Sequence, residues 1–390
     1  MAVNSGFTDG AYGELITKDK MSATYSFLIP ASVAGGTGLF TWGGYNNVGQ
    51  LGLGDVTDRS SPVQVGSLLT WNNIACRAFH TVATKTDGSL WSWGKNTDGQ
   101  LGLGNITDRS SPVQVGSLLT WNKIACGYHI VATKTDGSLW SWGKNTDGQL
   151  GLGDFTQRSS PVQVGSLLTW NNVAGGSNHT VAIKTDGSLW SWGLNFGGQL
   201  GLGNVTLRSS PVQVGSLLTW NKIAGGYDHT LATKTDGSLW SWGMNQVGQL
   251  GLGDVTPRSS PVQVGSLLTW NNVAGGYYHT LATKTDGSLW SWGFNAHGQL
   301  GLGDVTHRSS PVQVGSLLTW NNVAGGYYHN VATKTDGSLW SWGLNFGGQL
   351  GLGDIANRSS PVQVGSLLTW NKIACGYSHT VTTITTPLSW

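Results

Sequence analysis

The sequence has little charge, few cysteines and almost no glutamate. Of its 390 residues only 10% are charged, the formal net charge is +2, and Glu14 is the single glutamate. Recurring aspartates match most of the recurring cations, so no basic face is expected, which argues against a nucleic-acid partner. The three cysteines, Cys76, Cys126 and Cys375, share one position of a repeated pattern that is otherwise glycine. Their odd number and shared position predict small buried residues and argue against disulfides and a zinc site.

Long apolar runs and helical periodicity are missing as well. No stretch is long and apolar enough to span a membrane, and residues 1–37 lack the cationic start and apolar run of a secretion signal. We therefore expect no membrane span and no export by the general secretory route. Residues 1–37 also fall outside the repeated pattern, and two interpretations stay open. They form either a disordered leader or an arm that anchors residues 38–390 to a larger assembly.

What the sequence has in abundance is glycine, 60 residues of it, within a pattern of about fifty residues that occurs seven times. In one copy, residues 229–234 and 238–243 flank Thr-Asp-Gly, which is typical of a β-hairpin. Residues 261–264 and 267–273 add two short apolar runs, so each copy can supply four strands. The period predicts an all-β fold, a seven-bladed β-propeller over residues 38–390. The most constant segment, Trp-Gly-x-Asn-x-x-Gly-Gln-Leu-Gly-Leu-Gly, begins at Trp93, Trp142, Trp192, Trp242, Trp292 and Trp342, with a looser copy at Trp42.

The two ends of the repeated region predict how the ring closes. Residues 379–384 have the pattern of the first strand of a hairpin, but the sequence ends at Trp390 before a second strand follows. The matching second strand, residues 39–43, stands at the start of the region and has no first strand before it. Pairing of these N- and C-terminal strands would complete the seventh blade and leave no open sheet edge.

The order Gly-x-x-His-Thr, then Thr-Asp-Gly, then Trp-x-Trp-Gly-x-Asn-x-x-Gly-Gln-Leu-Gly resembles the regulator of chromosome condensation family of seven-bladed propellers over residues 38–390. The high regularity of the copies is interpreted as that of a phage-encoded form. Members of this family that exchange guanine nucleotides use acidic and aromatic loop residues on one face, and some members bind nucleosomes. This chain has no long inserted loop, no basic tail and almost no singular acidic residue. The resemblance therefore implies the fold and assigns no exchange residue.

No residue pattern predicts catalysis. Catalysis requires a local asymmetry, whereas nearly every polar group here recurs around the ring. Seven histidines are expected to start the inner strand of each blade and to form hydrogen bonds between blades. Seven equivalent residues around a channel lie too far apart to bind one metal ion at ~2.1 Å. We therefore expect no enzyme, no catalytic residue, no cofactor and no metal site. The histidines are His80, His129, His179, His229, His279, His329 and His379.

Differences between the copies concentrate just before the histidine, just after Trp-Gly, and just before a constant arginine such as Arg208. Residues that enter the first strand of a hairpin and residues that leave the second lie at the same end, so the first two sets should share one face. The constant Thr-Asp-Gly turns should mark the opposite face. Neutral drift in loops would also cluster changes there, but these changes are chemically drastic. The predicted ligand-binding face consists of Lys95, Asp98, Leu194, Phe196, Tyr227, Asp228, Met244, Gln246, Tyr277, Tyr278, Phe294, His297, Tyr327, Tyr328, Leu344 and Phe346.

The expected function is that of a non-enzymatic structural or recognition propeller, which presents the variable, aromatic-rich face to a protein or a glycan. Near-identical copies, the missing secretion signal and the leading segment together favour a virion or extracellular surface, such as a bacteriophage tail or capsid protein. A cytoplasmic protein-interaction adaptor is the first alternative and an exchange-factor-like regulator the second. Because propellers support many unrelated functions, the fold alone does not choose among them.

Overall fold

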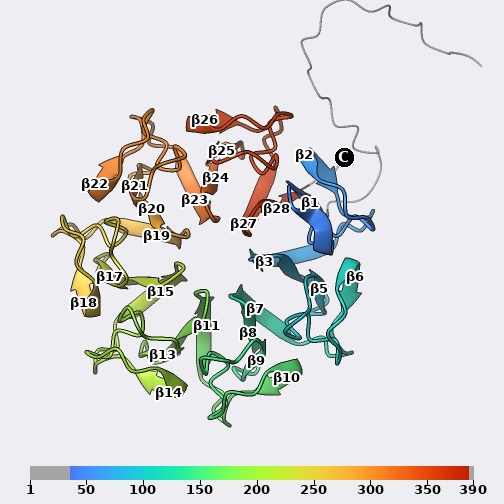
Figure 1. The fold of residues 1–390 in the computed structure, drawn as a ribbon, viewed down its shortest axis with the longest axis vertical. Coiled ribbons are helices and arrows are strands. Elements are labelled where there is room, and N and C mark those ends of the chain that lie inside the picture. Colours follow the sequence, from blue (N-terminus) through green and yellow to red (C-terminus); the bar gives the residue numbers. More distant parts are fainter. Residues whose placement is uncertain (1–35, 386–390) are drawn as a thin grey trace, which may run out of the picture. The chain divides into compact units, whose positions relative to one another are not determined.

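Seven four-stranded antiparallel sheets form blades around a central axis in the computed structural model, which describes residues 36–385 (Figure 1). The predicted seven-bladed β-propeller is confirmed. The predicted arm lies outside the described residues, except for Gly36 and Thr37. A short 3-10 helix, η1 (Asn46–Val48), follows the first strand. No helix within the described range is long and apolar enough to cross a membrane.

The innermost strand of each blade begins with a tryptophan, and the second strand begins with a histidine. The expectation that histidines start the innermost strand is therefore wrong by one strand. The Trp-Asn run before each hairpin pairs with it as a further strand and lies closest to the axis (Figure 1). The innermost strands are β3 (Trp71–Arg77), β7 (Trp121–Cys126), β11 (Trp170–Gly175), β15 (Trp220–Gly225), β19 (Trp270–Gly275), β23 (Trp320–Gly325) and β27 (Trp370–Cys375).

The remaining strands follow outward in the same order in every blade. The second strands are β4 (His80–Lys85), β8 (His129–Lys134), β12 (His179–Lys184), β16 (His229–Lys234), β20 (His279–Lys284), β24 (His329–Lys334) and β28 (His379–Thr385). The third strands are β5 (Leu90–Gly94), β9 (Leu139–Gly143), β13 (Leu189–Gly193), β17 (Leu239–Gly243), β21 (Leu289–Gly293), β25 (Leu339–Gly343) and β1 (Thr37–Gly43). The outer strands are β6 (Arg109–Gln114), β10 (Arg158–Gln163), β14 (Arg208–Gln213), β18 (Arg258–Gln263), β22 (Arg308–Gln313), β26 (Arg358–Gln363) and β2 (Arg59–Gln64).

Blades 1 to 6 are continuous in sequence, starting at β3, β7, β11, β15, β19 and β23, whereas blade 7 combines both ends of the chain in the order β2-β1-β28-β27. Strands β1 and β28 pair antiparallel from Thr37 opposite Thr385 to Gly43 opposite His379. The predicted closure by N- and C-terminal strands is therefore confirmed. The ring has no open edge between its first and last blade, which protects it from edge-to-edge association.

The hydrophobic core lies between neighbouring blades. One cluster joins Ala174 and Val181 of blade 3 to Trp220 and Trp242 of blade 4. The two tryptophan rings meet edge to face at 5.9 Å, and Trp242 Nε1 donates to the carbonyl of Gln199, in the loop of the preceding blade, at 3.0 Å. Trp242 is fully buried, and loss of such a ring costs roughly 3–5 kcal/mol. The constant tryptophans therefore hold each blade to the next.

Candidate functional site

The variable residues lie at one end of the strands, as predicted from the hairpin geometry. The backbone N–H after Trp-Gly donates to the carbonyl just before the histidine in several blades, for example Leu194 to Asn178 and Phe294 to Tyr278, each at 2.8 Å. The Thr-Asp-Gly turns close the opposite end of the same two strands. We call the end with the variable residues the mouth face and the end with the Thr-Asp-Gly turns the turn face.

The centre of the mouth face is a cavity lined by the residues that end the innermost strand or follow it. Counted with its open mouth, the cavity holds about 360 Å³ of empty space, of which about 30 Å³ admits the centre of a water molecule. Only a small chemical group therefore fits inside. Four of the lining residues are Gly325, Gly326, Cys375 and Gly376, and we call the other eight the mouth cluster: Arg77, Ala78, Tyr128, Ser177, Tyr227, Tyr277, Tyr327 and Tyr377.

Backbone hydrogen bonds between neighbouring blades hold several members of the mouth cluster in place. Tyr128 N donates to the carbonyl of Ser177 at 3.0 Å, and Ser177 N donates to the carbonyl of Tyr227 at 3.2 Å. On the other side, Tyr377 N donates to the carbonyl of Ala78 at 2.9 Å. Each of these bonds joins two neighbouring blades, so the lining side chains are positioned by the ring itself. A site built on such a closed scaffold is preorganised.

Four of the tyrosines form a continuous arc of aromatic contacts. Ring centroids are 3.9 Å apart for Tyr227 and Tyr277, 4.1 Å for Tyr277 and Tyr327, and 3.7 Å for Tyr327 and Tyr377. The arc ends on Phe79, whose ring stacks on Tyr377 at 5.1 Å. Burial raises the pKa of Tyr277 and Tyr377 above the usual tyrosine value, so both hydroxyls stay protonated at neutral pH.

In blades 5 and 6, further predicted residues pack around the tyrosines of this arc. Tyr278 contacts Tyr277 at 4.2 Å, and Tyr328 contacts Tyr327 at 4.1 Å between ring centroids. Phe294 lies 5.2 Å from Tyr328, and His297 lies 5.0 Å from the same ring. The structure therefore brings seven predicted residues into one aromatic patch: Tyr227, Tyr277, Tyr278, Tyr327, Tyr328, Phe294 and His297.

The other predicted residues of the mouth face lie in its outer loops. Phe196 and Phe346 are 54% and 43% exposed, and Phe346 meets Tyr45 edge to face at 5.1 Å. Asp98 accepts a hydrogen bond from Gln157 of the next blade at 3.2 Å. The last group is partly or largely exposed and is spread over four blades: Lys95, Leu194, Met244, Gln246 and Leu344.

Two charged groups break the repetition at the mouth. Arg77 reaches across the ring, and its Nη1 donates to the carbonyl of Gly225 in blade 4 at 3.0 Å. Asp228 was predicted as part of a ligand-binding face, but it is only 6% exposed. Its Oδ1 accepts a long hydrogen bond from Gln199 Nε2 at 3.5 Å. Burial raises the pKa of Asp228 to about 6, against the opposing effect of Arg77.

The predicted site omitted the single cation of the mouth cluster. Arg77 occupies a position that is glycine in the other six blades, Gly127, Gly176, Gly226, Gly276, Gly326 and Gly376. An alignment of the copies shows this departure, so a signal was available. Tyr128 and Tyr377 were also omitted, although each stands before a histidine like Tyr227. Ala78, Ser177 and Phe79 complete the set of residues that the prediction missed.

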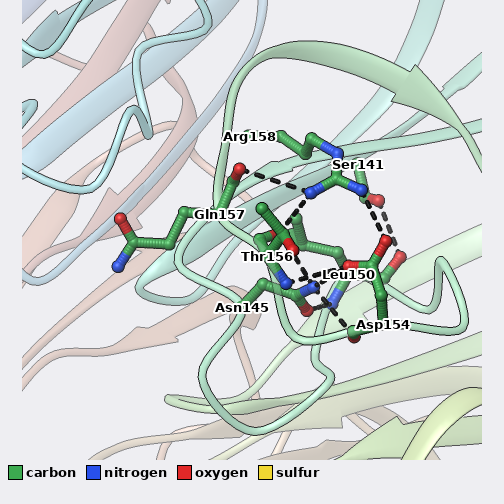
Figure 2. Close-up of polar contacts among 7 residues, drawn as sticks. All are labelled: Ser141, Asn145, Leu150, Asp154, Thr156, Gln157 and Arg158. Atoms are coloured by element: carbon green, nitrogen blue, oxygen red, sulfur yellow. Dashed lines mark hydrogen bonds and ion pairs between the residues drawn. The ribbon is translucent and has the colours of Figure 1, made fainter.

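The third variable position has a structural role in several blades. In the long loop after Trp-Gly, a constant asparagine organises the backbone, as Figure 2 shows for blade 2. Asn145 Nδ2 donates to the carbonyls of Asp154 and Thr156, while Leu150 N donates to Asn145 Oδ1 at 3.0 Å. Arg158 then pairs with Asp154 at 2.5 Å. Where the variable residue is Asp58, Asp108, His307 or Asn357, its side chain accepts the backbone N–H of the corresponding asparagine.

The histidines form the predicted hydrogen bonds between blades. His179 Nε2 lies 2.9 Å from Thr230 Oγ1 of the next blade, and His229 Nε2 lies 3.2 Å from Thr280 Oγ1. Burial lowers the pKa of His229 to about 3, so the ring is neutral at pH 7. His80 of blade 1 is the exception. The position in blade 2 that would supply its threonine partner is Ile130, and neither ring nitrogen of His80 has a hydrogen-bond partner among the described residues.

Metal-ligating side chains do not gather in groups of three or more within residues 36–385. The three cysteines are buried and free, as their shared position predicted. Burial raises the pKa of Cys375 to about 12, so its thiol stays protonated and unreactive at neutral pH. The arrangement at the mouth thus offers aromatic surface, hydroxyl groups and one guanidinium, which are suited to binding.

Comparison with protein families identifies the repeat. The chain matches the regulator of chromosome condensation (RCC1) repeat in seven segments, and it therefore belongs to this family: residues 38–84, 87–133, 136–183, 186–233, 236–283, 286–333 and 336–382. A second RCC1 repeat description matches six overlapping segments between residues 72 and 349. No curated protein sequence matches the chain significantly.

Solved structures with the same ring support the fold. Human WBSCR16 is 22% identical, with a TM-score of 0.80 over 89% of this chain and 98% of that one. Prp20p from Saccharomyces cerevisiae, described with its binding properties to Gsp1p and histones, is 23% identical, with a TM-score of 0.80 over 92% and 93%. Yeast RCC1 (Prp20) bound to Kap60 is 22% identical, with a TM-score of 0.81 over 97% of each chain. At these identities the likeness shows the fold and assigns no residue a role.

Proposed function

We propose that this member of the RCC1 repeat family is a non-enzymatic propeller that binds a protein partner through its mouth face. The continuous aromatic patch around Tyr277 and Tyr328 carries the proposal. Clustered, rigid aromatic side chains are the usual anchors of protein interfaces, because they bury a large area at low entropic cost. The polar groups that recur around the ring are occupied by turns and by contacts between blades.

The related structures support a protein as the partner. Prp20p is described as binding Gsp1p and histones, and it is also seen bound to Kap60. A propeller of the same family and fold can therefore serve as a protein-binding platform. This favours a protein-binding adaptor over a glycan-binding protein. An exchange-factor-like regulator is the second candidate on the same ground, and it requires that the partner be a guanine-nucleotide-binding protein.

The finer proposal concerns where the ring works. Its near-identical copies and the segment before the propeller support a position on a virion or an extracellular surface, anchored through residues 1–37. The cytoplasm is the alternative, and it follows from the adaptor and regulator candidates. Fractionation of producing cells and any particles they release, followed by detection of the chain, separates the two locations.

Site-specific photo-crosslinking tests the proposed face. A photoreactive phenylalanine analogue replaces Phe346 on the mouth face or Leu268 on the turn face, both of which are exposed, at 43% and 55%. In an extract of the producing cells, the mouth-face probe should form one dominant protein adduct and the turn-face probe none. Adducts only from Leu268 would contradict the proposal. A protease-resistant, periodate-sensitive adduct would identify a glycan instead.

Matched substitutions then show whether the aromatic patch supplies the affinity. Tyr328→Ser introduces the residue that blade 7 has at the same position, Ser378, so the backbone already tolerates it. Loss of an anchoring aromatic should weaken binding by roughly 1–4 kcal/mol. The control, Leu268→Ser on the turn face, should leave the adduct unchanged. Equal adduct formation by both variants would exclude the patch as the anchor.

A further inference from the structure

The cavity at the centre of the mouth face combines one cation with several hydroxyl groups. Its lining residues come from all seven blades, and Arg77 alone among these described residues carries a charge. The substitution of glycine by arginine occurs in one blade of seven, so it is a local departure from the scaffold.

The charge of Arg77 has no ionic partner within the described range. The ion pairs within residues 36–385 all join an arginine to an aspartate four residues away in the outer loops, such as Arg158 and Asp154, and Arg77 takes part in none. Its one hydrogen bond in this range uses a single N–H, to the carbonyl of Gly225. A guanidinium carries five N–H donors in a planar fork, so four remain. The carboxyl of Asp228 attracts this charge, but the two groups form no ion pair or hydrogen bond within the described range, so the cost of burying the cation is only partly offset.

The tyrosines around Arg77 add donors of the same kind. Burial raises the pKa of Tyr128 to about 12, with a smaller contribution from Tyr227, so the Tyr128 hydroxyl stays protonated. Protonated hydroxyls and guanidinium N–H groups together favour an acceptor with negative charge. The aromatic rings exclude water around that acceptor and thereby strengthen the attraction.

The geometry selects the class of anion. The free volume admits one small group, as described above, and excludes a sugar chain or a folded loop. The planar fork of a guanidinium matches the two oxygens of a carboxylate. A phosphate dianion would keep one charge uncompensated beside the single cation of the lining.

We propose that Arg77 and the tyrosines of the mouth cluster form a binding site for one carboxylate, supplied by the partner as an acidic side chain or a C-terminus. The site deepens the proposed function, because the aromatic patch would hold the partner while Arg77 selects its acidic group. Binding of a free carboxylate to the isolated ring does not require that partner.

Acetate titration of the full chain, labelled with ¹³C on its tyrosine rings, tests the site at pH 7.5 and constant ionic strength. Saturable shifts of the Tyr128 and Tyr227 signals are expected, with half-saturation at millimolar acetate. Arg77→Gly, which places in blade 1 the glycine of the other six blades, should weaken binding at least about tenfold. Arg77→Met keeps the aliphatic stem and should behave alike, so a packing effect is separated from the charge. Linear shifts without saturation, or equal affinity of the Arg77→Gly variant, would overturn the proposal.

Three further probes sharpen the result. N-acetylaspartate amide models an acidic side chain and N-acetylalanine models a C-terminus, and the tighter ligand identifies the source. Methylphosphonate binding more tightly than acetate would overturn the carboxylate assignment. Asp228→Asn introduces the residue that blade 3 has at the same position, Asn178. It should tighten acetate binding by removing a competing anion, and weaker binding would contradict the role given to Arg77. If acetate binds but the Phe346 probe forms no adduct, the anion site stands and the proposed function fails.

Discussion

The turn face and the mouth face are opposite ends of the same strands, yet one is repeated almost without change and the other differs in every blade. On the turn face, Asp236 Oδ1 accepts the backbone N–H and the hydroxyl of Ser238 at 2.9 and 2.7 Å, and Ser238 Oγ accepts Trp240 Nε1 at 2.9 Å. Lys234 Nζ then covers the ring of Trp240 at 3.7 Å. These linked contacts tie each turn to the core, so any change there costs stability.

The mouth face has fewer such constraints on its side chains. Its positions are held by backbone hydrogen bonds such as that of Tyr377 N to the carbonyl of Ala78, which any residue except proline can form. Aromatic, acidic, small and basic side chains therefore replace one another on one scaffold. The repeated unit thus separates the residues that carry stability from the residues that are free to carry recognition.

Some of the residues that recur on the turn face are exposed to solvent. A pair of leucines stands beside each turn in most blades, for example Leu267 and Leu268, which are 50% and 55% exposed. A groove next to this pair is lined by Trp270, Lys284 and Trp290. Scattered exposed apolar residues are common on soluble proteins. The turn-face control used above, Leu268→Ser, therefore also tests whether this apolar ring contributes to binding.

Opening the ring should have the largest effect, because both faces depend on closure. Deletion of residues 379–390 removes β28, so one edge of β1 is left unpaired along its whole length and β27 loses its neighbour in the sheet. We expect loss of cooperative unfolding or aggregation, since an unpaired edge strand and an incomplete repeat array are both exposed. Thermal unfolding followed by circular dichroism measures this effect. A deletion variant that melts like the intact chain would refute the closure.

Acid should destabilise both faces together through the histidines between them. Burial lowers the pKa of His80 and His329 to about 3, well below the value of about 6.5 for an exposed histidine. The unfolded chain therefore binds more protons below pH 6.5, and stability that is complete above this pH is lost as the pH falls toward 3. Each histidine can contribute a few kcal/mol, so unfolding is expected before pH 3. A melting temperature that stays constant from pH 7 to pH 4 would contradict this.

Asp228 should show the opposite dependence on the mouth face. Its folded pKa of about 6 lies above the ordinary value of 3.8, so the folded chain holds the proton more tightly, and stability decreases as the pH rises from about 4 to 6. The shift corresponds to about 3 kcal/mol. Asp228→Asn should therefore gain stability over the wild type between pH 4 and pH 7. Urea unfolding of both proteins at each pH cancels the histidine effect, and a constant difference would show that the carboxyl is not strained.

A pair of substitutions at the two ends of neighbouring hairpins should separate stability from binding. Asp236→Ala on the turn face removes two hydrogen bonds and should lower the free energy of unfolding by roughly 1 kcal/mol, with partner binding unchanged. Tyr278→Ser on the mouth face introduces the residue of blade 7 and should change binding more than stability. Urea unfolding and the crosslinking yield from Phe346 measure the two effects. If Asp236→Ala instead weakened binding and Tyr278→Ser mainly lowered stability, the separation of stability and binding between the two faces would be refuted.

The smallest change in stability is expected at His80, the one histidine without the hydrogen bond to the next blade. Ile130→Thr restores in blade 2 the partner that His179 has in Thr230, and should give His80 Nε2 a hydrogen bond. A gain of about 1 kcal/mol from this bond is offset because a hydroxyl replaces the buried ethyl group of Ile130. We expect a net change below about 1 kcal/mol. The His80 ring signals in an NMR spectrum should shift, whereas acetate binding at the mouth should not.

Much of the fold could be predicted from the sequence, because each local pattern occurs in up to seven copies that support the same prediction. The hairpin around Thr-Asp-Gly, four strands per blade, closure through residues 39–43 and 379–384, and the buried cysteines were all predicted correctly. The strand order within a blade was misassigned, since the histidine hairpin carries the strongest local signal and the Trp-Asn strand before it carries a weak one. The ligand role of the mouth face remains a prediction.

Local pattern and period determined the architecture, because turn residues and alternating apolar residues act over a few neighbours and recur. Which variable residues meet was decided only by the tertiary structure. Tyr277 and Tyr327 are fifty residues apart and touch because neighbouring blades bring equivalent positions together around the axis. Arg77 and Gly225 are 148 residues apart and meet because the ring brings blades 1 and 4 to a common centre. Contacts of this kind arise from ring closure, which no local pattern contains.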